Sequence, residues 1–159
     1  MPNMLFLCTG NSARSILGEV LLNHLGGGVW RGWSAGSNPV GQVNPHALAL
    51  LAERGHDASG LSSKRWDVVA GPDAPVMDAI ITVCDAAAGE ACPVWPGRPL
   101  TSHWGMPDPA TAPDAVSARA AFAATYDTLH RRLSALLALP FSDMDAAQVK
   151  AALDRIGSS

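Results

Sequence analysis

The chain has 159 residues, of which 48% are hydrophobic and 16% are charged, so it is too apolar for a disordered segment and has the length of one ordinary domain, residues 1–159. Its formal net charge of −3 excludes a broad basic surface for nucleic acid or acidic lipid. No charged leader precedes the first apolar run, and no apolar stretch approaches the ~20 residues that span a bilayer. We therefore expect a cytoplasmic protein with neither a nucleic-acid nor a membrane partner.

Buried-strand patterns alternate with amphipathic-helix patterns along the chain. Continuous apolar runs indicate strands covered on both faces, whereas apolar residues at spacings of three and four indicate helices. In the first half the expected elements are a strand over 4–7, a helix over 16–25 that ends at three glycines, a strand over 29–35, and a helix capped by Asn44, begun by Pro45 and ended by Gly55.

The second half continues the alternation. We expect a strand over 79–83, a short edge strand within 93–100, a loop through the two X-Pro steps of 102–111, a helix over 114–139 ended by Pro140, and a last helix capped near Ser142 that ends at Gly157. Strands that alternate with helices predict an α/β domain with a parallel sheet.

The stretch "CTGNSARS", residues 8–15, joins the first strand to the first helix. In a parallel sheet, ligands bind at the carboxyl ends of the strands, and the N-terminus of a helix attracts anions. Arg14 adds a planar guanidinium that can bind two oxygens at once. We therefore expect a loop that binds a tetrahedral oxyanion through Thr9, Gly10, Asn11, Ser12, Ala13 and Arg14.

Cys8 is the expected nucleophile of this loop. The helix terminus and the guanidinium of Arg14 favour its thiolate form, Ser15 can donate a hydrogen bond to the sulfur, and Asn11 can fix the loop. The Cys-x5-Arg spacing is weak evidence by itself, and its position between a strand and a helix makes it informative. The alternative is a small buried side chain at a strand end. A Walker phosphate loop is excluded because no Gly-Lys-Ser/Thr ending follows.

Three segments carry a resemblance to a known family. "CTGNSARS" at 8–15, "SAGS" at 34–37 and "MPDPA" at 106–110 resemble the low-molecular-weight tyrosine phosphatase superfamily. "VCDAAAGEACPVWPG" followed by "HWGMPDP" is similar to its thiol-dependent arsenate reductase branch, and the likeness covers nearly the whole chain. The resemblance implies a three-layer fold, with a four-stranded parallel sheet flanked by helices, and one oxyanion site.

Two further cysteines fit a reductase. Cys84 ends a strand expected beside the first one, and Cys92 follows eight residues later. The resemblance implies that Cys8 attacks arsenate, Asp108 protonates the departing oxygen, and Cys84 then Cys92 take the oxidising equivalents as a disulfide. Phosphate and sulfate would compete with arsenate. Thioredoxin or another thiol donor, such as glutathione with glutaredoxin, would reduce the final pair.

Other interpretations of these residues remain open. Cys84 can be a core residue, Cys84 and Cys92 can bind zinc with His103, and Asp108 can be only a turn former before Pro109. His103 and Trp104 are expected to pack under the loop. An oxyanion-binding module without catalysis is a further alternative.

A phosphomonoesterase that works through a phosphocysteine is the main competing function. It would need only Cys8, Arg14 and Asp108, because water would resolve the intermediate. Family phosphatases carry tyrosines after the Asp-Pro pair, where this chain has Ala110 and Thr111. Its single tyrosine lies within the long predicted helix, which weakens a phosphotyrosine function.

We expect neither a cofactor nor a metal. Some reductases of this branch bind potassium near the active loop, and Asn11, Glu19 and Ser34 match ligands of that site. Lys64 stands where the family has an acidic ligand. Its ammonium group can take the place of the ion.

Overall fold

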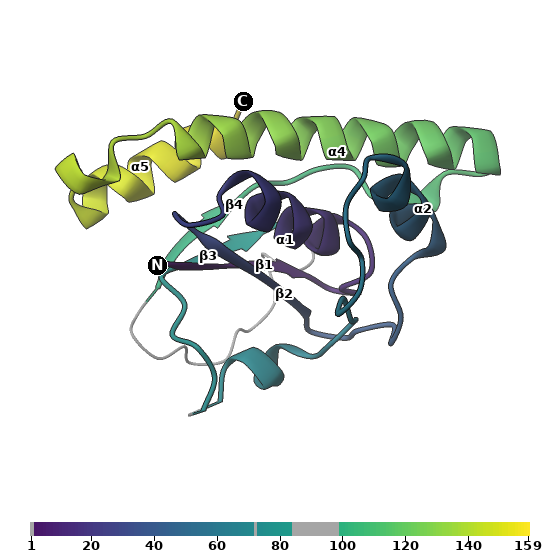
Figure 1. Ribbon diagram of the computed structural model, residues 1–159, viewed down its shortest axis with the longest axis horizontal. Helices are drawn as coiled ribbons and strands as arrows, with labels where there is room; N and C mark the ends of the chain where they lie inside the picture. Colours follow the sequence, from purple (N-terminus) through teal and green to yellow (C-terminus); the bar gives the residue numbers. More distant parts are fainter. Residues whose placement is uncertain (1, 72, 84–98) are drawn as a thin grey trace.

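The computed structural model describes residues 2–71, 73–83 and 99–159. Four strands form one parallel sheet in the order β2-β1-β3-β4 (Figure 1). Their bounds are Asn3–Cys8 for β1, Arg31–Gly36 for β2, Ala79–Thr82 for β3 and Leu100–His103 for β4. The predicted α/β fold with a four-stranded parallel sheet is confirmed.

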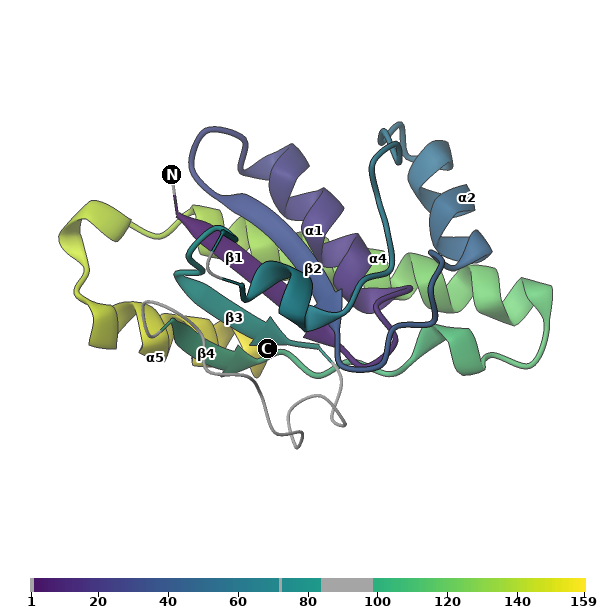
Figure 2. The ribbon, with the colours of Figure 1, turned by 90° about the horizontal axis from the view of Figure 1, so that it is seen from below.

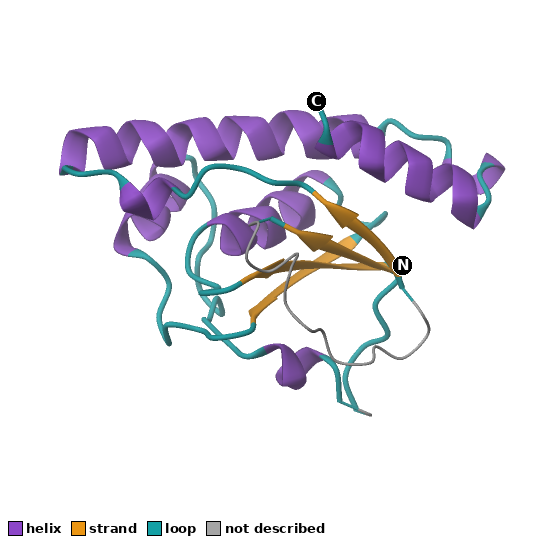
Figure 3. Cartoon of the chain, turned by 180° about the vertical axis from the view of Figure 1, so that it is seen from behind, coloured by secondary structure: helices purple, strands orange, loops and turns teal. Residues whose placement is uncertain are grey.

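The long helices form a layer on one face of this sheet, as Figures 1 and 3 show. They are α1 (Arg14–Leu25), α2 (Pro45–Glu53), α4 (Ala115–Leu137) and α5 (Ala146–Gly157). Short 3₁₀ helices lie at Trp66–Val69 (η1), Pro109–Thr111 (η2) and Phe141–Asp143 (η3). Within the described ranges, no helix is long and apolar enough to cross a bilayer.

Alternate residues of β1 enter two different cores. Met4 and Phe6 belong to the core that contains residues of α1, α4 and α5, whereas Leu5 and Leu7 belong to a second core with Val69 of η1. Figure 2 shows α4 on the far side of the sheet from the viewer and η1 on the near side. The alternation follows from the two-residue period of a strand. All four side chains are almost completely buried, and burial of each contributes roughly 1.5–3 kcal/mol to stability. Because both faces of β1 are covered, its residues 4–7 are all apolar, and this buried strand determines where Cys8 lies.

Local capping chemistry explains where the helices begin. Asn44 accepts a hydrogen bond from the His46 N–H at 2.8 Å, and Pro45 is the first residue of α2, as predicted. The predicted cap of α5 near Ser142 is wrong. Asp145 caps that helix in a reciprocal capping box with Gln148, and Ser142 lies in η3. An Asp three residues before a Gln satisfies two backbone donors, which a cap at Ser142 with Asp145 cannot do.

The fourth strand lies later in the chain than predicted. β4 covers Leu100–His103, part of which we expected to be loop, and residues 93–98 lie outside the described range. β4 pairs with β3 from Ala79–Leu100 to Thr82–His103. Its polar residues reflect an edge position, where alternate side chains face solvent. Backbone pairing with β3, rather than side-chain pattern, sets this strand. The second strand likewise begins at Arg31 instead of Val29, because Val29 and Trp30 donate to Gly26 in a turn.

A histidine joins three helical segments on the helical side of the fold. The His56 ring nitrogen Nε2 lies 2.6 Å from Tyr126 Oη on α4, and the His56 ring lies 4.7 Å from that of His24 on α1. Burial lowers the pKa of His56, and the neighbouring His24, Arg54 and His130 lower it further. The folded protein therefore favours neutral His56.

We predict that the free energy of unfolding falls as the pH drops below about 6.5. A folded-state pKa below the unfolded value means that the unfolded chain binds more protons in this window, so acid favours unfolding. Urea unfolding between pH 7.5 and 5.0 should show a weaker pH dependence for His56→Gln than for the wild type. The exposed His46→Gln is the matched control. Equal pH slopes in the two variants would contradict the prediction.

Candidate functional site

Cys8 ends β1 at the carboxyl edge of the sheet, with 7% of its surface exposed. It pairs in register with Gly36 at the end of β2. A Cβ at Gly36 would lie 2.4 Å from the Thr9 carbonyl oxygen and 2.8 Å from that of Cys8. Only glycine allows this approach, so Gly36 lets the chain turn tightly after the cysteine.

The loop after Cys8 turns its carbonyl groups outward. Thr9 O and Gly10 O accept from the N–H groups of residues 38 and 40 at 3.0 Å, and Ser12 O accepts from Asn44 N–H at 2.9 Å. In contrast, the N–H groups of residues 10–14 donate no hydrogen bond to any other described residue. Buried N–H groups without partners are costly, and a run of them before a helix forms an anion-binding concavity. This arrangement of N–H groups is the one that an oxyanion loop requires, and oxyanion binding itself stays a prediction.

Asn11 holds the loop in an uncommon conformation. Its φ is +45°, the left-handed region that asparagine tolerates better than most residues. The side chain is fully buried: Nδ2 donates to Ser15 Oγ at 2.9 Å, and Oδ1 accepts from Lys64 N–H at 2.9 Å. The predicted pinning role of Asn11 is thus confirmed. Because Ser15 accepts this bond, its hydroxyl hydrogen stays available for donation.

Arg14 connects the oxyanion loop with the segment between β4 and α4. Nη1 donates to the Met106 carbonyl at 2.9 Å, and Nη2 lies 3.6 Å from Asp108 Oδ2. The Arg14 side chain is only 12% exposed. We expected this guanidinium to bind two oxyanion oxygens, and the structure also connects it to the segment that carries the candidate acid.

Asp108 has two contacts of different kinds. Oδ1 accepts from the Ala110 N–H at 2.9 Å and caps η2, while Oδ2 faces Arg14. The carboxylate is 40% exposed, so solvent reaches it. The turn-forming interpretation is therefore correct for one oxygen, and the other is placed at the loop. The two roles do not exclude each other.

Cys84 and Cys92 lie outside the described residues. β3, which precedes Cys84, runs parallel to β1 and pairs Thr82 with Leu7. Val83 N–H donates to the Leu7 carbonyl at 2.9 Å. The chain therefore leaves β3 at the same sheet edge where β1 delivers Cys8, as the sequence predicted.

Two of the residues that match potassium ligands, Glu19 and Ser34, contact each other and lie beside Lys64. Ser34 Oγ donates to Glu19 Oε1 at 2.7 Å, and the Lys64 ammonium lies 3.8 Å from the same oxygen. Lys64 Nζ also donates to the Ser62 carbonyl at 3.0 Å. Side chains of Lys64 and Glu19 are 21% and 16% exposed. A fixed positive charge thus sits beside the carboxylate, and no cluster of metal-binding side chains occurs in the described ranges.

Trp104, His103 and Tyr126 have bonding partners outside the oxyanion loop. Trp104 is fully buried and donates from Nε1 to the Leu153 carbonyl at 2.9 Å, as expected for packing. His103 lies on β4, with Nδ1 2.8 Å from Thr82 Oγ1. Tyr126 lies on α4 and bonds His56, away from the loop.

Sequence reasoning missed one contributor to the loop. Ser63 donates from Oγ to the Gly10 carbonyl at 3.1 Å and accepts from Gly41 N–H at 3.2 Å. It thereby joins the oxyanion loop to the segment after β2. The polar stretch "SSK" that contains it was the available signal, but no local pattern shows which carbonyl such a hydroxyl reaches.

Comparison with known proteins agrees with this geometry. The family described as "Low molecular weight phosphotyrosine protein phosphatase" matches residues 3–152. The arsenate reductase of Bacillus subtilis (strain 168) is 37% identical over 107 residues, which is 67% of this chain and 73% of that protein.

Two solved structures share the fold. The thioredoxin-dependent arsenate reductase of Corynebacterium glutamicum has a TM-score of 0.60 and is 25% identical. The match covers 84% of this chain and 59% of the other chain. The arsenate reductase of Archaeoglobus fulgidus has a TM-score of 0.62 and 28% identity over 82% of this chain and 98% of its own.

The expected phosphatase-like fold is therefore confirmed, with the Cys8 loop after β1 and the Asp-Pro segment after β4. The matched range includes the oxyanion loop, Arg14 and Asp108. The chain belongs to the low molecular weight phosphotyrosine protein phosphatase family.

Proposed function

We propose that this chain reduces arsenate to arsenite, with Cys8 as nucleophile, Cys84 and Cys92 as the resolving pair, and an external thiol donor. The observation that carries the proposal is the loop after Cys8, in which five consecutive N–H groups lack partners among the described residues while the carbonyls face away. Such a loop suits a tetrahedral oxyanion. Relatives named arsenate reductase favour arsenate over a phosphate ester.

The first step forms a bond between sulfur and arsenic. The Cys8 thiolate attacks arsenic(V), and one arsenate oxygen leaves with a proton from Asp108. Loop N–H groups and Arg14 bind the other oxygens and stabilise their negative charge. Ser15 Oγ accepts a hydrogen bond from Asn11 Nδ2, and we expect its hydroxyl to donate to the Cys8 sulfur.

The second step transfers two electrons. The Cys84 thiolate attacks the Cys8 sulfur, a disulfide forms, and the electron pair of the sulfur–arsenic bond stays on arsenic as arsenite leaves. The Cys92 thiolate then attacks Cys84, which forms the Cys84–Cys92 disulfide and frees Cys8. Thioredoxin or a comparable thiol donor reduces this last disulfide. No other cofactor is needed.

In this mechanism, Arg14 places the acid Asp108 beside the bound anion. Its guanidinium bonds the Met106 carbonyl and faces Asp108, so the acid-bearing segment is tethered to the oxyanion loop. An arriving oxyanion competes with Asp108 for the guanidinium and leaves the carboxyl beside the anion's oxygens. Proton donation requires such proximity.

A phosphomonoesterase is the competing function. Arsenate and phosphate have the same charge and nearly the same shape, so the loop alone binds both. The additional cysteines are what favour reduction, since a hydrolase has no task for them.

We predict that Cys84→Ser and Cys92→Ser each end multiple turnover and leave Cys8 reactive. The thiol relay needs both sulfurs, whereas the first attack needs neither. Arsenate-dependent oxidation of reduced thioredoxin measures turnover, and mass spectrometry after one turnover identifies the trapped disulfides. Cys8→Ser is the inactive control. Unchanged arsenite production by both variants would refute the relay, and p-nitrophenyl phosphate turnover faster than arsenate reduction would favour the phosphatase.

Asp108→Asn should lower kcat for arsenate by about 10²–10⁴-fold with little change in unfolding midpoint. The amide oxygen still caps η2 through the Ala110 N–H but carries no acidic proton. Asp114→Asn is the matched control, because Asp114 caps α4 through the Ser117 N–H. Activity of Asp108→Asn equal to that of this control would leave Asp108 as a turn former only.

Exchange of sodium for potassium should leave the wild-type rate unchanged, because the Lys64 ammonium already lies beside Glu19. Lys64→Met removes this charge, and we expect a lower rate that potassium partly restores. Steady-state kinetics at constant ionic strength test both statements. A wild-type rate that rises sharply with potassium would contradict the substitution of an ion by Lys64.

A further inference from the structure

The segment that carries Asp108 begins at a buried tryptophan. Trp104 directly follows β4, and its side chain is fully buried. Its backbone N–H donates to the Thr82 carbonyl at 2.7 Å, which continues the pairing with β3 beyond the last residue of β4. Asp108 lies four residues further along the chain. The start of the acid-bearing segment is therefore fixed where Trp104 is fixed.

The indole of Trp104 packs against the backbone of α5. Its Nε1 donates to the Leu153 carbonyl at 2.9 Å. A Cβ at Gly157, the last residue of α5, would overlap the indole Cδ1 and lie 2.7 Å from the His103 carbonyl oxygen. Only glycine permits this contact. α5 thus holds the indole by one hydrogen bond and one close backbone contact.

The same indole contacts the strand that carries Cys8. The rings of Trp104 and Phe6 on β1 pack edge to face, with centroids 6.4 Å apart and planes inclined by 63°. Phe6 is fully buried, and a Cβ at Gly18 of α1 would lie 2.8 Å from its ring, so the ring lies directly against the backbone of α1. Trp104 therefore connects α5 with the strand that ends at Cys8.

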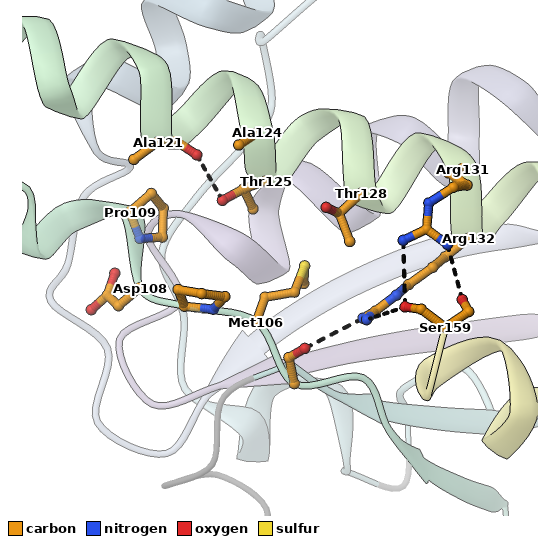
Figure 4. Close-up of a pocket in the computed structure, with 12 residues that line it drawn as sticks. Met106, Asp108, Pro109, Ala121, Ala124, Thr125, Thr128, Arg131, Arg132 and Ser159 are labelled. Carbon is orange, nitrogen blue, oxygen red and sulfur yellow. Dashed lines mark hydrogen bonds between the residues drawn. The ribbon is translucent and has the colours of Figure 1, made fainter.

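Two arginines hold the two residues that follow the indole. Arg132 donates from Nη1 to the Gly105 carbonyl at 3.5 Å, and Arg14 donates from Nη1 to the Met106 carbonyl at 2.9 Å. Figure 4 shows Arg132 reaching from α4 toward the segment of Met106 and Asp108. Three successive residues from the indole onward are thus each bonded to a different helix, α5, α4 and α1. This anchored stretch ends two residues before the proposed acid.

We propose that Trp104, held by α5, is a positioning residue that sets the distance of Asp108 from the bound oxyanion, an inference that rests on the proposed reductase function. Asp108 is 40% exposed and its Oδ2 lies 3.6 Å from Arg14, a pair too exposed to fix the carboxyl by itself. Proton transfer needs the acid within hydrogen-bond reach of the departing oxygen, and a misplacement of about 1 Å can cost about 10²-fold in rate. Trp104 acts on the rate through Asp108 and does not touch the substrate.

Trp104→Phe tests this proposal, because phenylalanine keeps a buried ring but cannot donate to the Leu153 carbonyl. We expect the rate of arsenite formation in a single turnover to fall about tenfold. Phosphate affinity, measured by protection of Cys8 against alkylation, should stay unchanged. Trp30→Phe is the matched control, since Trp30 is buried in the same core and its Nε1 has no hydrogen-bond partner among the described residues.

A double-mutant cycle separates positioning from general damage to the fold. In the Asp108→Asn background, Trp104→Phe should lower the rate no further, because the indole acts only through the acid. Gly157→Ala should give the same pattern. Its methyl group displaces the indole, whereas alanine favours helix over glycine and does not weaken α5 itself. Equal losses of rate in both backgrounds would overturn the proposal.

Hydrogen exchange supplies a measurement that does not depend on arsenate. The N–H groups of Ala110 and Thr111 bond oxygens of Asp108. Both should exchange faster in the two variants of the indole contact than in the wild type, as measured by NMR. Unchanged exchange would refute the positioning role. A wild type that forms no arsenite would instead refute the proposed reductase, and the exchange result would still decide whether the indole holds this segment.

Discussion

The orientation of the peptide groups between Cys8 and α1 is the constraint on which the site depends. Carbonyl groups of this loop bond outward to residues 38, 40 and 44, so its N–H groups are left to face the other way. Gly36 permits the close approach, and Asn11 supplies the positive φ. The sheet fixes where the loop begins, because β1 is buried on both faces. The proposed anion site is thus formed by backbone N–H groups, and side chains hold its conformation.

Arg14 and Lys64 connect the loop to two different parts of the fold. Arg14 links the loop to the segment of Met106 and Asp108, which makes the candidate acid part of the same unit. Lys64 links the loop to α1, because its N–H bonds Asn11 and its ammonium faces Glu19. Each of them lies beside a carboxylate, Asp108 for Arg14 and Glu19 for Lys64.

The sequence by itself determined the features that depend on neighbours along the chain. Apolar runs predicted three of the four strands, Asn44 and Pro45 predicted the start of α2, and Cys8 followed by small polar residues and Arg14 predicted an anion loop. The strands and the start of α2 are confirmed, because strand burial and helix capping are local in origin, whereas anion binding by the loop stays a prediction. The predicted cap at Ser142 was wrong because the Ser142–Asp145 spacing resembles a capping box, whereas the box that forms lies three residues later, between Asp145 and Gln148.

Only the tertiary structure decided the features that join distant residues. Arg14 and Met106 are 92 residues apart, and Lys64 and Asn11 are 53 apart. β4 is set by backbone pairing with β3, which its polar side chains do not reveal. Such contacts depend on where the folded sheet and helices bring their ends together, and no pattern within a short window records that distance.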